Sequence, residues 1–107
     1  MTRVLVNPGI CGMTVTIEVV KVSKRKVRVK ITSDCEVVTK MGESLVELDQ
    51  KDALKPILQS EVYKCASECR FRTSCPVPMA ILKAIAVKAE LALPRPVLVH
   101  FETARQG

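Results

Sequence analysis

The sequence TVTIEVVKVSKRKVRVKI, residues 14–31, decides the fold. β-Branched residues dominate it, and its apolar and polar side chains alternate. Val15, Ile17 and Val19 fall on one face of a first strand, and strict alternation returns over residues 26–31. The pattern predicts an antiparallel hairpin with one buried face and one solvated face.

A helix is expected directly after this hairpin. Ser33-Asp34-Cys35-Glu36 has the form of a capping box, with Ser33 at the N-cap and Glu36 reaching back to it. Behind the box, spacings of three and four residues produce one apolar stripe. That stripe consists of Val37, Val38, Met41, Leu45 and Leu48.

Two further helices are expected in the second half of the chain. Ser60 is suited to cap a short helix over Glu61–Cys69. The longest helix runs from Pro76 to about Leu91, because proline is tolerated in a first turn. A short helical turn is also expected between Asp49 and Pro56.

Strands are expected at both ends of the chain. Residues 3–6 suit a short strand in front of the hairpin, and Val97–Phe101 suits a final strand. The prediction is one α+β domain over residues 1–107. Its small, mainly antiparallel sheet, built from the N-terminal hairpin and the C-terminal strand, is covered on one face by about three helices.

Composition excludes several classes of protein. The chain has 107 residues, 48% of them hydrophobic, and a net charge of +6, so a disordered chain is not expected. No apolar run approaches the roughly 18–20 residues that span a bilayer, and the N-terminal apolar stretch is too short for a signal peptide. A cytoplasmic protein without membrane contact is therefore expected.

The five cysteines carry the chemistry that the sequence suggests. An odd number without an export signal argues against a disulfide framework, and soft thiolates favour zinc or an iron–sulfur cluster. Cys11 lies in a glycine-flanked loop, Cys35 and Cys75 lie at expected helix starts, and Cys69 ends a helix. These four are the predicted metal ligands or redox thiols, whereas Cys65 suits the core. Because no Cys-x-x-Cys pair exists, the site depends on loops that converge in space.

Two resemblances extend this hypothesis. Cys75-Pro76-Val77-Pro78 resembles the Cys-Pro-x-Pro motif of the SirA/TusA-like sulfur-carrier family, which implies that Cys75 carries sulfur as a persulfide. Over most of its length the chain also resembles an uncharacterised family of small proteins from anaerobic prokaryotes, through residues 7–12, 33–36 and 69–78. That resemblance groups Cys11, Cys35, Cys69 and Cys75 and implies no activity.

Other features point less to function. A basic cluster lies at Lys21, Lys24, Arg25, Lys26, Arg28 and Lys30. It suits a solvated strand face or a basic interaction module, and nucleic acid is not expected because no aromatic residue accompanies it. His100 is expected to be exposed or structural. No phosphate loop, serine-nucleophile motif or carboxylate pair is present, so the expected partner is a protein of sulfur or metal chemistry rather than an enzyme substrate.

Overall fold

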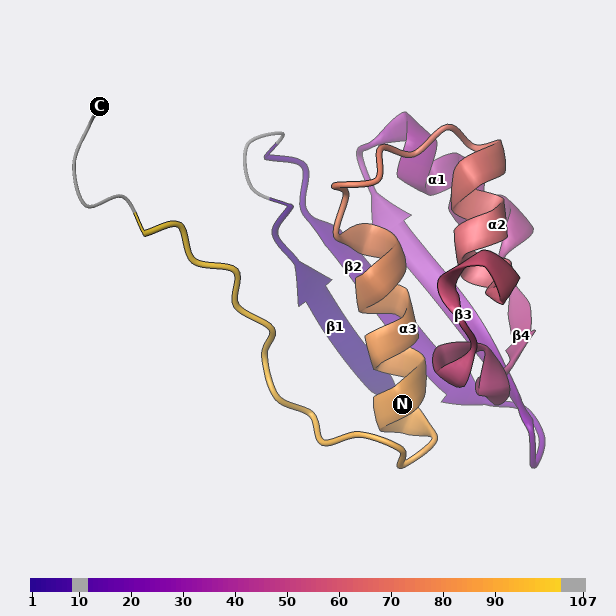
Figure 1. Ribbon diagram of the computed structural model, residues 1–107. Coiled ribbons are helices and arrows are strands. Elements are labelled where there is room, and N and C mark those ends of the chain that lie inside the picture. The colour runs from indigo at the N-terminus through magenta and orange to yellow at the C-terminus, as the bar shows by residue number, and fades with distance from the viewer. Residues whose placement is uncertain (9–11, 103–107) are drawn as a thin grey trace.

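A computed structural model describes residues 1–8 and 12–102, and it places helices on one face of a four-stranded antiparallel sheet (Figure 1). The strands follow the order β1-β2-β3-β4. They span β1 Thr2–Val6, β2 Val15–Lys21, β3 Lys26–Ser33 and β4 Glu47–Asp49. The predicted α+β class, with helices on one side of a small antiparallel sheet, is confirmed.

The hairpin of β2 and β3 forms as predicted. Val15, Ile17 and Val19 are buried on the helix side, and Ile17 pairs with Ile31 across the hairpin. On the opposite face Glu18 lies between Arg3 of β1 and Lys30 of β3. Burial of one face and solvation of the other therefore follow the alternation of the sequence.

Three α-helices cover the buried face: α1 Glu36–Ser44, α2 Glu61–Glu68 and α3 Val77–Lys88. Two short 3-10 helices, η1 Gln50–Leu54 and η2 Ile57–Gln59, connect β4 to α2. Helix α3 packs on β1 and β2, and α1 packs on β3. Within the described residues, no helix is both long enough and apolar enough to traverse a bilayer.

The capping box predicted at Ser33 is wrong. Strand β3 continues through Ser33, which pairs with Val15, so the N-cap of α1 is Cys35. The Ser33 hydroxyl accepts the Cys35 amide at 3.1 Å and donates to the Thr14 carbonyl at 3.2 Å. Ser33 therefore joins the strand end to the helix start instead of capping the helix.

The apolar stripe of the first helix divides between two elements. The helix ends at Ser44, Leu45 is its C-cap, and Leu48 belongs to β4, where it pairs with Val27. Both leucines are buried as the stripe requires. The periodicity identified four of its five residues as core correctly, but Val37 is 38% exposed. It also assigned Leu48 to the wrong element, because a half-buried strand buries such a leucine as well.

The strand predicted over Val97–Phe101 is also wrong. Residues 91–102 form neither helix nor strand and run away from the body of the molecule (Figure 1). The additional strands beside the hairpin are β1, which extends the short strand expected at residues 3–6, and β4.

Candidate functional site

Cys35 lies where β3 passes into α1. It is half-buried and packs against the hydrophobic core. As the N-cap it precedes the first turn of a nine-residue helix, and its carbonyl accepts the Thr39 amide at 2.9 Å. The first amides of such a turn lack intrahelical acceptors and form the positive end of the helix dipole.

Cys69 ends α2 as predicted and is its C-cap. Arg70 follows with φ 62°, and the Phe71 amide then donates to the Ala66 carbonyl at 2.9 Å. This is a Schellman ending, in which a left-handed residue reverses the chain and the next side chain packs back on the helix. Cys69 and Phe71 are accordingly half-buried against the core.

Cys75 directly precedes Pro76, the N-cap of α3. It is half-buried against the core, and its amide donates to the Arg72 carbonyl at 3.1 Å. The turn over residues 72–75 therefore fixes the backbone from which the Cys75 side chain projects, at the start of a twelve-residue helix.

These three cysteines belong to one end of the molecule. Figure 1 shows the start of α1, the end of α2 and the start of α3 together at the upper end of the view. Within the described ranges, however, no three His, Cys, Asp or Glu side chains are grouped closely enough to hold a metal ion. Cys11, the fourth predicted ligand, lies outside the described residues.

Cys65 belongs to the core, as predicted, with 8% of its surface exposed. Burial raises the pKa of Cys65 to about 11, and the neighbouring Cys69 and Glu68 add to the increase, whereas a hydrogen bond with Ser44 opposes it. Cys65 is therefore a neutral thiol at physiological pH. It borders an open hollow of about 310 Å³ between β4 and α2, into which Glu47, Glu61 and Glu68 also face.

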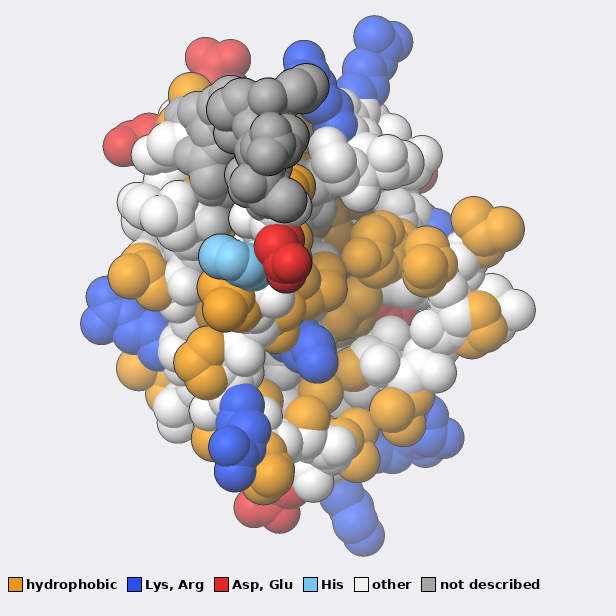
Figure 2. All heavy atoms as spheres, turned by 60° about the vertical axis from the view of Figure 1, so that its left-hand side comes forward, with side chains coloured by type: hydrophobic (Ala, Val, Ile, Leu, Met, Phe, Trp, Pro, Cys, Tyr) orange, Lys and Arg blue, Asp and Glu red, His pale blue; other side chains and the backbone are white. Residues whose placement is uncertain are grey.

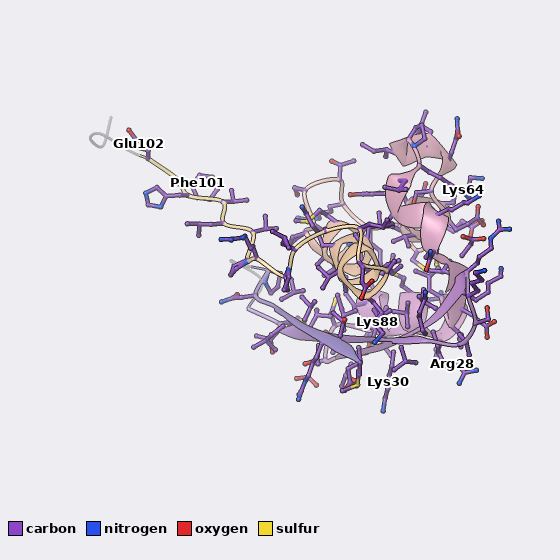
Figure 3. The ribbon with its side chains drawn as sticks, turned by 90° about the horizontal axis from the view of Figure 1, so that it is seen from below. Arg28, Lys30, Lys64, Lys88, Phe101 and Glu102 are labelled. Carbon is purple, nitrogen blue, oxygen red and sulfur yellow. The ribbon has the colours of Figure 1, made fainter. Side chains whose placement is uncertain are left out.

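Three members of the basic cluster, Lys26, Arg28 and Lys30, lie on the face of the sheet that the helices leave open, because they alternate with the buried valines of β3. The other members belong to the end of β2 and to the turn before β3. Arg28 and Lys30 point away from the helices (Figure 3). Carboxylates are interleaved with these cations: Glu18 pairs in register with Lys30, and Arg28 lies 3.7 Å from Glu47. This arrangement supports the solvated strand face that was expected over a dedicated anion-binding surface.

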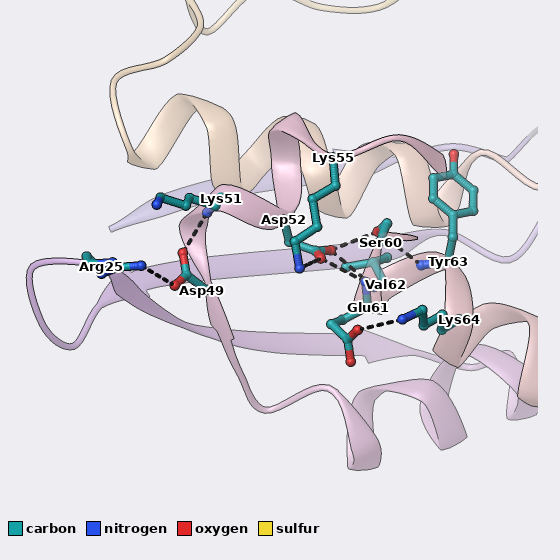
Figure 4. A network of polar contacts seen from close by, with 10 residues as sticks. All are labelled: Arg25, Asp49, Lys51, Asp52, Lys55, Ser60, Glu61, Val62, Tyr63 and Lys64. Carbon is teal, nitrogen blue, oxygen red and sulfur yellow. Dashed lines mark hydrogen bonds and ion pairs between the residues drawn. The ribbon is translucent and has the colours of Figure 1, made fainter. Parts of the chain in front are cut away.

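Sequence reasoning missed a buried carboxylate, Asp52 in η1 (Figure 4). Its oxygens accept hydrogen bonds from the Ser60 hydroxyl at 2.8 Å and from the Glu61 and Val62 amides at 2.7 and 3.2 Å. Lys55 lies 3.7 Å away. Asp52 therefore accepts the first amides of α2 from outside that helix, and Lys55 supplies a positive charge beside the buried carboxylate. These contacts give Asp52 a structural role.

One family model matches the chain. It is described as a family of unknown function (DUF6951), and the match covers residues 2–101. No curated protein and no solved structure matches the chain significantly. The match agrees with the expected uncharacterised family and gives no support to the sulfur-carrier resemblance.

Proposed function

The chain belongs to DUF6951, a family of unknown function, and within it we propose a thiolate site that binds a soft metal, zinc or an iron–sulfur cluster. The ligands are Cys11, Cys35, Cys69 and Cys75. The observation that carries the proposal is the placement of Cys35, Cys69 and Cys75, all half-buried, on the β3–α1 and α2–α3 connections at one end of the fold.

Local electrostatics favour this use of the thiols. Cys35 precedes the first turn of α1, and Cys75 lies two residues before the first residue of α3. Both residues therefore lie at the positive end of a helix dipole, where a negatively charged metal–thiolate group is favoured. Several thiolates in one place repel one another, and a bound divalent cation or cluster removes that repulsion.

Packing fixes the backbone of Cys35 and Cys69, which are the caps of α1 and α2. Cys75 lies on the turn over residues 72–75, beyond the end of α2. Because zinc–sulfur bonds are about 2.3 Å long, metal loading has to move this turn as a unit within the α2–α3 connection, towards Cys35. The proposal therefore includes a movement of this connection, with the sheet unchanged.

Metal analysis of anaerobically purified protein tests the proposal. One zinc per chain without colour indicates a zinc site, and iron and sulfide with visible charge-transfer absorption indicate a cluster. Cys35→Ser, Cys69→Ser and Cys75→Ser are each expected to lose most of the metal, whereas Cys65→Ser keeps it. Wild-type protein that binds neither metal after reconstitution contradicts the proposal, and equal loss in Cys65→Ser contradicts the ligand set.

Sulfur transfer through Cys75 is a second candidate, favoured by the position of Cys75 directly before α3. In this reaction the Cys75 thiolate attacks the outer sulfur of a donor persulfide, the donor thiolate leaves, and Cys75 becomes the persulfide. Incubation with a cysteine desulfurase and cysteine, followed by mass spectrometry, is expected to show one added sulfur, lost in Cys75→Ser and kept in Cys69→Ser. No added sulfur on the wild type excludes this candidate.

A further inference from the structure

The segment after α3 is rich in apolar side chains and forms no helix or strand. Residues 91–102 leave the body of the molecule, and Figure 3 shows Phe101 and Glu102 far from the helices. The large apolar side chains from residue 97 onward have between 52% and 85% of their surface exposed: Val97, Leu98, Val99 and Phe101. Water contact over so many adjacent apolar side chains is unfavourable, which indicates that they have a partner in solution.

The composition of this segment suits strand pairing. Val97-Leu98-Val99-His100-Phe101 combines β-branched and aromatic residues with alternation. Pro94 and Pro96, just before it, hold the chain extended and direct it away from its own helix. The family match extends to residue 101, so the segment is part of the pattern that defines the family.

A receptive sheet edge exists at β1. This strand lies at one end of the strand order, so every second N–H and C=O along its outer side has no strand beside it in the described part of the chain. β1 has five residues, of which Arg3 is the one with a charged side chain, and Leu5 is 74% exposed. The other edge, β4, has three residues and carries Glu47 and Asp49, charges that discourage strand addition.

Hydrophobic side chains also gather on the side of the molecule that bears the segment. Figure 2 shows them around His100, the pale-blue side chain, and along the neighbouring surface. Val4 of β1 and Leu82 of α3 are half-buried against the core. A strand laid along β1 would place alternate residues over these side chains and the remainder beside Leu5.

We propose that two copies of this chain exchange these segments, so that residues 97–101 of each copy extend the sheet of the other at β1. Every copy carries one exposed apolar segment and one open sheet edge at β1, so a two-fold pair occupies both in each copy. In the structure the segment rises on the outer side of its own β1 and then turns away from the body without pairing with that strand (Figure 1), which leaves both the segment and the edge available to a second copy.

The size of this contact sets its strength. Each copy contributes five residues of β1 and five of the segment to the pair. Those ten residues are about a third to a half of the roughly 20–30 residues per side of a standard interface, so the dimer is expected to dissociate in about the micromolar range or above. Dimerisation is consequently expected at high protein concentration and not at low concentration.

Sedimentation of the full-length chain over a concentration series, with reductant present, tests the exchange. The average mass is expected to rise from the 11.8 kDa of one chain towards twice that value. Val99→Pro removes an amide from the added strand, and Leu5→Lys places a charge on the edge that receives it. Both variants are expected to stay monomeric, whereas Leu58→Lys, an identical change at an 88% exposed leucine of η2, dimerises like the wild type.

Amide hydrogen exchange separates the alternatives. Protection of residues 97–101 is expected to rise with concentration together with the mass. A monomer at every concentration with protected segment amides means that the segment pairs with its own β1, and a monomer with unprotected amides means that it stays free; either result overturns the exchange. A dimer that survives both Val99→Pro and Leu5→Lys overturns it as well, and circular dichroism confirms that each variant is folded.

Discussion

Replacing Asp52 by alanine is expected to destabilise the fold more than any other single change at a polar side chain described above. The carboxylate is 1% exposed and accepts three hydrogen bonds. Two of the donors are the amides of Glu61 and Val62, the first residues of α2, which have no intrahelical acceptor. With alanine at position 52, these two amides are left without an acceptor at a site that is shielded from water.

The magnitude follows from the number of orphaned donors. A buried donor without a partner costs about 1–3 kcal/mol, and the Ser60 hydroxyl can rotate to another acceptor, so two amides account for about 2–6 kcal/mol. A domain of this size has about 5–15 kcal/mol of total stability. The loss corresponds to a fall of roughly 10–30 °C in the melting temperature.

Urea unfolding at neutral pH, followed by circular dichroism, measures this loss. Asp52→Asn keeps one acceptor oxygen and is expected to lose less than Asp52→Ala. Asp49→Ala is the matched control, because Asp49 also accepts an amide, that of Lys51 at 2.9 Å, but in contact with solvent, so its loss should be clearly smaller. A loss below about 1 kcal/mol for Asp52→Ala, or one equal to that of Asp49→Ala, would refute the reasoning.

Further outcomes are expected elsewhere in the molecule. Alkylation of Cys65 should remain slow until the pH nears 11. Because the pKa of Cys65 is higher in the folded than in the unfolded chain, its contribution to stability is complete below about pH 9 and is lost as the pH rises through 11. Urea unfolding over this pH range, compared with Cys65→Ala, measures that contribution. Met41→Ala should cost about 2–5 kcal/mol in thermal unfolding, because this methionine is fully buried between α1 and the sheet. Lys30→Glu sets a second carboxylate opposite Glu18 and should cost about 0.2–1 kcal/mol in urea unfolding, a cost that Lys30→Gln should mostly avoid.

Local patterning was sufficient for elements that are paired with a neighbour in sequence. The β2–β3 hairpin follows from uninterrupted alternation, and the Ser60 cap of α2 follows from a serine directly before the helix. Leu48 shows where such patterning fails. A buried leucine at this position fits both a helix stripe and a half-buried strand. The strand forms because Leu48 pairs with Val27, which lies 21 residues earlier in the chain.

The candidate site could be anticipated only as a set of positions. Cysteines beside helix ends are visible in the sequence, and Cys35, Cys69 and Cys75 do occur at such ends. Their gathering at one end depends on how α1, α2 and α3 stack on the sheet, which no local pattern determines. The capping role of Asp52 could not be predicted either, because its first partner, Ser60, lies eight residues later in the chain and is brought close only by the 3-10 helices between β4 and α2.

The two proposals use different ends of α3 and can therefore fail separately. Cys75 precedes the start of this helix, whereas the exchanged segment begins beyond its end at Lys88. If both hold, Cys75→Ser lowers metal content without changing the mass series, and Val99→Pro changes the mass series without lowering metal content. A dimer that forms only with metal bound would contradict this independence. It would mean that thiolates of two copies bind one ion, and the exposed apolar segment after α3 would then still have no partner.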